Sequence, residues 1–177
     1  MPDVIVTNTT TNLIAVQQAT NTVPVVFLSV SDPVAQGFVA SVAKPGGNLT
    51  GFSAFEFSIG GKWLDLLKEI APGLERVGIV FNPDTSPQSK FFVRSIEAAA
   101  PSLGVQSIVV PVRATADIEP AFENFARAPN GGVILTSDTF TAMRQNLIVD
   151  LVSRYRLPAI SSNARFPKDG GFDVLRR

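Results

Sequence analysis

Short apolar runs rich in β-branched residues alternate along the chain with longer stretches of helical period. Such runs are typical of strands buried on both faces of a sheet, and they cover residues 4–7, 23–30, 76–82, 105–112, 131–137 and 157–161. The longer stretches carry apolar residues at spacings of three and four, as amphipathic helices do. They are "TNLIAVQQAT", "GGKWLDLLKEIAP", "SKFFVRSIEAAAPSLG", "ATADIEPAFENFAR" and "TAMRQNLIVDLVSRYR". This order predicts an α/β fold with parallel strands and right-handed crossovers.

The alternation is uneven along the chain. From residue 59 to residue 162 it is regular and predicts one compact parallel lobe. Before Pro45 it predicts only two strands and two helices, the second helix beginning near Ala35. A two-stranded parallel sheet cannot cover itself, so this section either packs on the edge of the later sheet or is part of a second lobe. The polar, glycine-rich stretch 44–61 between them predicts a linker or hinge.

Composition excludes several classes of function. Fifteen basic residues balance fifteen acidic ones without a basic run, which argues against a nucleic acid or an anionic membrane as partner. The chain has no cysteine and no histidine, so disulfides, thiol nucleophiles and Ser-His-Asp or Cys-His catalysis are excluded. It has no apolar run of about 18 residues to span a bilayer, and the N-terminal "MPDVIVTNTT" lacks the features of a signal peptide.

A polar turn follows most of the expected strands. Ligands of open α/β sheets bind beyond the carboxyl ends of the strands, and these turns offer hydroxyl, amide, carboxylate and helix N-terminal N–H groups to a polar ligand. The turns are "NTTTN", "SDPV", "NPDTSP", "SDTFT" and "SSNARF". We expect the first four on one side of a shared cleft, with Asp84 and Thr85 at the start of a helix. The alternative is that the same residues only cap helices.

Enzyme signatures are absent from the sequence. "PGGNLTG" does not have the spacing of a dinucleotide-binding loop, and "GGKW" does not have that of a phosphate-binding loop. Asp32, Asp84 and Asp138 each follow a strand, as phosphorylated or metal-binding aspartates often do, but helix capping and turn formation explain them as well. We therefore expect no catalysis, no metal and no cofactor.

Several motifs together resemble one family. They are "SDPV", "PGGNLTGFS", "KWLDLLKEIAPGLERVGIVFNP", "SIEAAAPSLGV", "FARAPNGGVIL" and "RLPAIS". Their order is similar to that in the substrate-binding proteins of ABC transporters, in the family related to the tryptophan- and tyrosine-binding components of Gram-positive uptake systems. The resemblance implies a type I periplasmic binding fold, with two Rossmann-like lobes, strands crossing between them and a ligand in the cleft.

The resemblance also implies a domain organisation. Residues 1–52 would be a partial first lobe with the hinge entry, residues 53–171 the second lobe, and residues 172–177 the start of a return crossing. "SDPV" would be a cleft turn, "AQGFVASVAKPGGN" the last helix and loop of the first lobe, and "LTGFS" the first crossing strand. The chain would then be a fragment whose first lobe is incomplete, and we expect it to associate as a homodimer through that lobe.

The ligand-binding residues implied by the resemblance come from both lobes and the hinge. They are Thr9, Thr10, Thr11, Asp32, Pro33, Phe52, Ser53, Asn82, Asp84, Thr85, Ser86, Asp138 and Thr139. The implied function is capture of a small polar solute, such as an amino acid, for an importer with permease and ATPase subunits. The full-length protein would be periplasmic or extracytoplasmic. An effector-sensing domain of a transcriptional regulator is the alternative, since it can have the same fold.

Overall fold

The computed structural model describes residues 2–163 and divides the chain into two compact units. The first unit ends at Phe57 and the second begins at Ser58. Sequence reasoning placed the boundary after Phe52, within the strand that the structure assigns to the first unit. The expected return crossing at residues 172–177 and the end of the second lobe, residues 164–171, lie outside the described residues.

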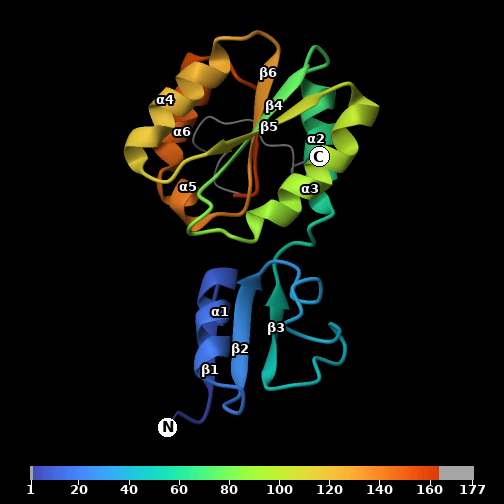
Figure 1. Cartoon of the computed structure of the whole chain (residues 1–177), viewed down its shortest axis with the longest axis vertical. Helices are drawn as coiled ribbons and strands as arrows, with labels where there is room; N and C mark the ends of the chain where they lie inside the picture. Colours follow the sequence, from blue (N-terminus) through green and yellow to red (C-terminus); the bar gives the residue numbers. More distant parts are fainter. Residues whose placement is uncertain (1, 164–177) are drawn as a thin grey trace. The chain divides into compact units, whose positions relative to one another are not determined.

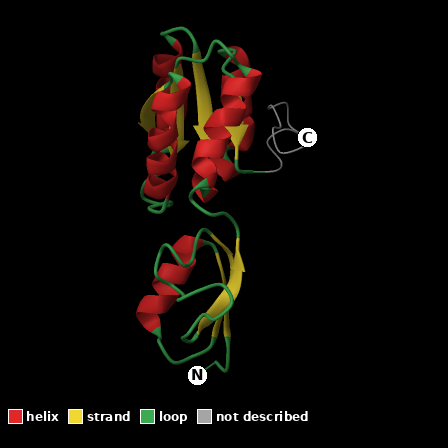
Figure 2. Cartoon of the chain, turned by 90° about the vertical axis from the view of Figure 1, so that its right-hand side faces the viewer, coloured by secondary structure: helices red, strands yellow, loops and turns green. Residues whose placement is uncertain are grey.

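The first unit contains a three-stranded parallel sheet in the order β1-β2-β3. Its strands are β1 (Ile5–Asn8), β2 (Val25–Val30) and β3 (Leu49–Ser53). Helix α1 (Thr10–Ala19) lies against one face of this sheet (Figure 1, Figure 2). The core between helix and sheet consists of Leu13, Val25, Phe27, Val30, Val39 and Leu49.

Two expectations for the first unit are wrong. The helix expected from Ala35 does not form, and residues 31–48 are turns and bends. Gly37 and Gly46 there have positive φ angles of 74° and 83°, a conformation that ends helices. Val39 is nevertheless only 6% exposed. This apolar residue therefore belongs to the core, although the segment that carries it is not helical.

The segment "LTGFS" is a third strand of the first sheet. The sequence predicted only two strands for this section. Instead β3 pairs in parallel with β2, and Val25 faces Leu49 in the register. The segment contains only one β-branched residue, Thr50, and a glycine, so its local propensity for a strand is weak.

The second unit contains a four-stranded parallel sheet in the order β5-β4-β6-β7. Its strands are β4 (Arg76–Phe81), β5 (Gln106–Pro111), β6 (Gly131–Leu135) and β7 (Ala159–Ser161). The prediction of a parallel α/β lobe over residues 59–162 is confirmed. Burial on both faces is confirmed for the central strands β4 and β6, whereas the edge strand β5 is partly exposed along its length.

Helices cover both faces of the second sheet (Figure 1). On one face lie α2 (Ile59–Ile70) and α3 (Ser89–Ala99), and a short 3-10 helix (Ala100–Leu103) follows α3. On the other face lie α4 (Thr115–Ala126), α5 (Thr139–Met143) and α6 (Gln145–Arg154). Sequence reasoning expected one helix where α5 and α6 stand, but the backbone breaks at Arg144.

Glycine is required where β3 approaches β2. Gly51 has a φ of 156°, and a Cβ atom added there would lie 2.0 Å from the carbonyl oxygen of Phe27. That oxygen belongs to the backbone of the central strand, so a side chain at residue 51 would push β3 away from β2. The approach of β3 to the sheet therefore depends on the absence of a side chain.

We predict that Gly51→Ala destabilises the first unit by about 2 kcal/mol or more, since backbone strands must separate. Hydrogen exchange by mass spectrometry should show faster exchange in the peptides of β2 and β3. Gly47→Ala is the matched control, because nothing lies within 4 Å of the added Cβ, and it should change stability by about 0.5 kcal/mol or less. Equal exchange in the two variants would contradict the prediction.

Candidate functional site

The turns after β4 and β6 form a continuous polar edge in the second unit. These two strands are hydrogen-bonded neighbours, and Val80 faces Leu135 near their carboxyl ends. Because both strands run in the same direction, the turn at residues 82–86 and the turn at residues 136–141 leave the sheet side by side. This is the position where open α/β sheets bind ligands.

Asp138 joins the two turns through its carboxylate. One oxygen, Oδ2, accepts hydrogen bonds from the backbone N–H of Asn82 at 3.0 Å and of Thr141 at 3.3 Å. The other, Oδ1, accepts one from the Thr85 hydroxyl at 2.8 Å and one from the Phe140 N–H at 3.0 Å. The residue is 7% exposed. Asp138 therefore caps α5 and also holds the neighbouring turn.

Asn82 shapes the turn after β4 from inside. Its Oδ1 accepts hydrogen bonds from the N–H groups of Asp84 at 2.9 Å and Thr85 at 3.3 Å. Its Nδ2 donates to the carbonyl oxygen of Arg113 at 3.0 Å. Asn82 thus holds backbone groups of Asp84, Thr85 and Arg113. It is only 2% exposed, so almost none of its side chain is accessible to a ligand.

A chain of buried hydroxyl groups runs beneath the same edge. The Ser86 hydroxyl lies 2.7 Å from that of Ser89 and donates to the carbonyl oxygen of Ser137 at 2.9 Å. The Ser89 hydroxyl in turn lies 2.8 Å from that of Thr136. These bonds again connect the β4 turn to the β6 turn. With Asn82 and Asp138 they make a rigid platform, which we define as residues 82, 86, 89, 136 and 138.

Three of the expected site residues are exposed on this platform, namely Asp84, Thr85 and Thr139. The expectation that Asp84 and Thr85 begin a helix is wrong, because α3 begins at Ser89. They lie in the preceding turn, where Asn82 rather than a helical ladder holds their backbone. Their side chains are therefore presented by a turn that the buried platform fixes.

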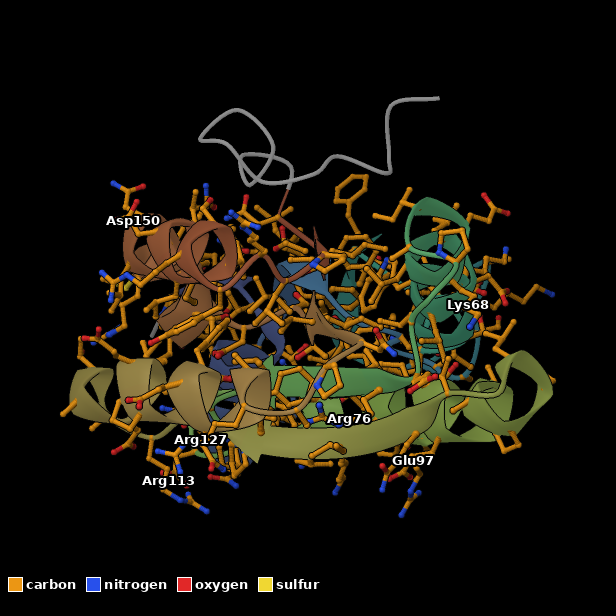
Figure 3. All side chains as sticks on the ribbon, turned by 90° about the horizontal axis from the view of Figure 1, so that it is seen from above. Lys68, Arg76, Glu97, Arg113, Arg127 and Asp150 are labelled. Atoms are coloured by element: carbon orange, nitrogen blue, oxygen red, sulfur yellow. The ribbon has the colours of Figure 1, made fainter. Side chains whose placement is uncertain are left out.

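Asp84 forms an ion pair with Arg113, the residue two positions after β5. The two side chains are 64% and 59% exposed, and Figure 3 shows Arg113 extending outward from the ribbon. The hydrogen bond to Asp84 raises the pKa of the Arg113 guanidinium above its ordinary value. The ion pair lies at the carboxyl edge of the second sheet.

In the first unit, the residues after β1 have different environments. Thr9 precedes α1 with a φ of 72° and makes no side-chain capping bond to that helix. Thr10 is 2% exposed, and its hydroxyl accepts a hydrogen bond from the Ser31 N–H at 3.2 Å. Thr11 is exposed in the first turn of α1. Thr10 thus connects the turn after β1 to the turn after β2, whereas the side chain of Thr11 is accessible to solvent.

Asp32 ties the turn after β2 to the segment that leaves β3. Its Oδ1 accepts the Ala35 N–H at 3.0 Å, and its Oδ2 accepts the Phe57 N–H at 3.2 Å. Its own N–H donates to the carbonyl oxygen of Phe55 at 2.7 Å. The neighbouring Pro33 is buried. Asp32 has a positive φ of 38°, which is uncommon outside glycine but more frequent for aspartate than for most residues.

The two residues expected at the hinge are exposed on β3. Phe52 is 70% exposed, and Ser53 pairs with Val30 at the end of the strand. Among the described residues no group of acidic side chains lies close enough to hold a metal ion. The polar edges offer hydrogen bonds and fixed charges, which can bind a polar ligand.

Arg113 was missed as a site residue. The rule that selected the other turns, a polar group directly after a strand, also applies to Arg113 after the strand 105–112. It was overlooked because its turn contains no run of Ser, Thr, Asn or Asp.

No helix in the part of the chain that the structure describes is long and apolar enough to cross a membrane.

Comparison with known proteins gives a consistent result. A tyrosine-binding protein of Clostridioides difficile (strain R20291) is 25% identical over 160 residues, which are 90% of this chain and 45% of that protein. A conserved domain protein of Vibrio cholerae matches with a TM-score of 0.83 and 25% identity, over 97% of this chain and 56% of that one.

A third similar protein is the ABC domain from Streptococcus pneumonia, whose structure is in complex with L-Trp. It matches with a TM-score of 0.83 and 22% identity, over 97% of this chain and 58% of that one, and so shows the shared fold. The chain spans about half the length of these relatives.

The model of one family matches almost the whole sequence, over residues 1–174. The chain belongs to the family of ABC transporter substrate-binding proteins.

Proposed function

We propose that this chain is part of the solute-binding component of an ABC importer and that its solute is a small polar molecule of the amino-acid type. The observation that carries the proposal is the polar edge of the second unit, where exposed Asp84, Thr85 and Thr139 stand on the buried platform. A rigid, already hydrogen-bonded wall loses little entropy when a ligand binds. A solute can therefore bind there without the turns having to fold first.

The names of similar proteins support an amino acid as ligand. One relative is a tyrosine-binding protein, and one structural neighbour was crystallised with L-Trp. The exposed groups fit such a ligand, because hydroxyl and carboxylate groups can bind its ammonium and a guanidinium can bind its carboxylate. In the proposed full-length protein the other partners are permease and ATPase subunits, and the location is extracytoplasmic.

The residues expected to bind ligand divide into two proposed roles. Asp84, Thr85 and Thr139 of the second unit are exposed and are proposed to contact the solute, and Thr11, Phe52 and Ser53 are exposed in the first unit. Asn82, Ser86, Asp138, Thr10 and Pro33 are buried and are proposed to hold the turns in place. Asp32 and Thr9 lie between these classes, half-buried in turns where their φ angles are positive.

Titration of the 177-residue chain with L-tyrosine and L-tryptophan tests the function. We expect saturable heat release in calorimetry and a rise in thermal midpoint, since a ligand that binds only the folded state stabilises it. D-glucose is the control solute and should produce neither. Binding of glucose with no response to either amino acid would overturn the proposed ligand class, and no response to any solute would overturn the proposed function.

The platform role of Asp138 predicts a large loss of stability in Asp138→Ala. Two buried N–H groups would lose their acceptor, which costs about 2–4 kcal/mol in total. Trp63 is the single tryptophan and is buried in the second unit, so its fluorescence during urea unfolding measures this change. Thr139→Ala, at the adjacent exposed position, is the control and should cost about 0.5 kcal/mol or less.

We also propose that the chain associates through the open face of the first sheet. Val4, Val6, Leu28 and Phe52 are 51%, 65%, 38% and 70% exposed, and a parallel sheet is normally covered on both faces. Burying such a patch against a second copy removes apolar surface from water.

Sedimentation velocity at low micromolar concentration tests this association. The unaltered chain should sediment as a dimer, and Val6→Asp should shift it towards monomer because a carboxylate resists burial. Val109→Asp on β5, at a position that is 42% exposed in the second unit, is the matched control and should remain dimeric. A monomeric unaltered chain would contradict the proposal.

A further inference from the structure

The Asp84–Arg113 ion pair is more than a surface contact between two turns. The backbone of both residues is hydrogen-bonded to the side chain of Asn82. The Asp84 N–H donates to Asn82 at 2.9 Å, and the Arg113 carbonyl accepts from Asn82 at 3.0 Å. The Arg113 N–H also donates to Asp117 at 2.9 Å. One buried amide thus positions the backbone of both charged residues.

The pair is only partly satisfied. Contact is between one guanidinium nitrogen, Nη1, and one carboxylate oxygen, Oδ1. A guanidinium has five N–H donors and a carboxylate has two acceptor oxygens. Among the described residues, none donates a hydrogen bond to Oδ2 of Asp84 and none accepts one from the other nitrogens of Arg113. Donors and an acceptor of opposite charge therefore remain side by side on the exposed edge.

An exposed ion pair of this kind contributes little to stability, because water solvates both charges in its absence. The pair can therefore open to a ligand at little cost in stability. An α-amino acid carries an ammonium and a carboxylate on the same carbon atom. Its ammonium is complementary in charge to Asp84, and its carboxylate is complementary in charge to Arg113.

Resting on the proposed function, we infer that Asp84 and Arg113 together recognise the zwitterionic head of an α-amino acid. Asp84 accepts hydrogen bonds from the ammonium, and Arg113 donates to the carboxylate. A ligand with only one of the two charges leaves one member of the pair without its new partner, so the site distinguishes amino acids from simple amines and simple carboxylates. Nothing in this recognition requires a metal ion or a covalent step.

The test uses three probes that share one ring system: L-tryptophan, tryptamine, which lacks the carboxylate, and 3-indolepropionate, which lacks the ammonium. Calorimetry on the 177-residue chain compares the unaltered protein with Asp84→Asn and Arg113→Gln. Asp84→Asn should weaken L-tryptophan and tryptamine by about tenfold and leave 3-indolepropionate unchanged. Arg113→Gln should weaken L-tryptophan and 3-indolepropionate by about tenfold and leave tryptamine unchanged.

The matched control is a second exposed pair in the same unit, Arg154 with Glu119, whose side chains are 58% and 54% exposed. Arg154→Gln and Glu119→Gln should alter none of the three affinities. Equal weakening of all probes, or no weakening, in the Asp84 and Arg113 variants would overturn the inference while L-tryptophan binding by the unaltered chain upholds the proposed function. If the unaltered chain binds none of the probes, both fall together.

Discussion

The carboxylate of Asp138 is the contact on which the polar edge of the second unit depends. Four hydrogen bonds end on it, from two turns that are 56 residues apart at their most distant bonded positions. Burying a carboxylate is unfavourable unless hydrogen bonds replace its water, and here they come from a helix N-terminus and a neighbouring strand end. The same bonds that solvate the charge thus set the distance between the turns that bear Asp84 and Thr139.

Asn82 extends this arrangement to a third strand end. A single amide group has one acceptor oxygen and two donor hydrogens, and Asn82 uses both kinds of atom on backbone that belongs to different turns. The edge is therefore built from two layers. The lower layer consists of buried side chains whose hydrogen bonds go to protein, and the upper layer consists of exposed charged and hydroxyl groups. The proposed binding of a solute by the upper layer requires the lower layer to stay in place.

Most of the second unit could be predicted from the sequence, because its strands contain many β-branched residues and are separated by helices with a clear apolar face. The first unit was harder. Val39 is buried and Phe38 partly buried in a turn-rich segment whose apolar spacing resembles that of a helix, and β3 has a glycine where a strand usually has a side chain to pack. In both cases contacts between segments far apart in the sequence decided the structure, and local periodicity contains no information on them.

The candidate site shows the same limit. The strand-end rule found Asp84, Asp138 and Thr85, but it could not separate a buried carboxylate that caps a helix from an exposed one. That difference depends on which side chains surround each turn in three dimensions. Arg113 was missed for a related reason, since its interest arises from its partner across the sheet and not from its neighbours in sequence.

The hydrogen bonds between Asp32 and the segment that leaves β3 have a mechanical consequence. Hydrogen bonds to Phe55 and Phe57 hold that strand exit as far as the last residue of the first unit, and α2 begins at Ile59. Only Ser58 separates these hydrogen-bonded residues from the next helix, so very few backbone torsions connect the two units at this point. A joint this short loses little entropy when it is held in one orientation, since the cost of ordering backbone rises with each residue involved.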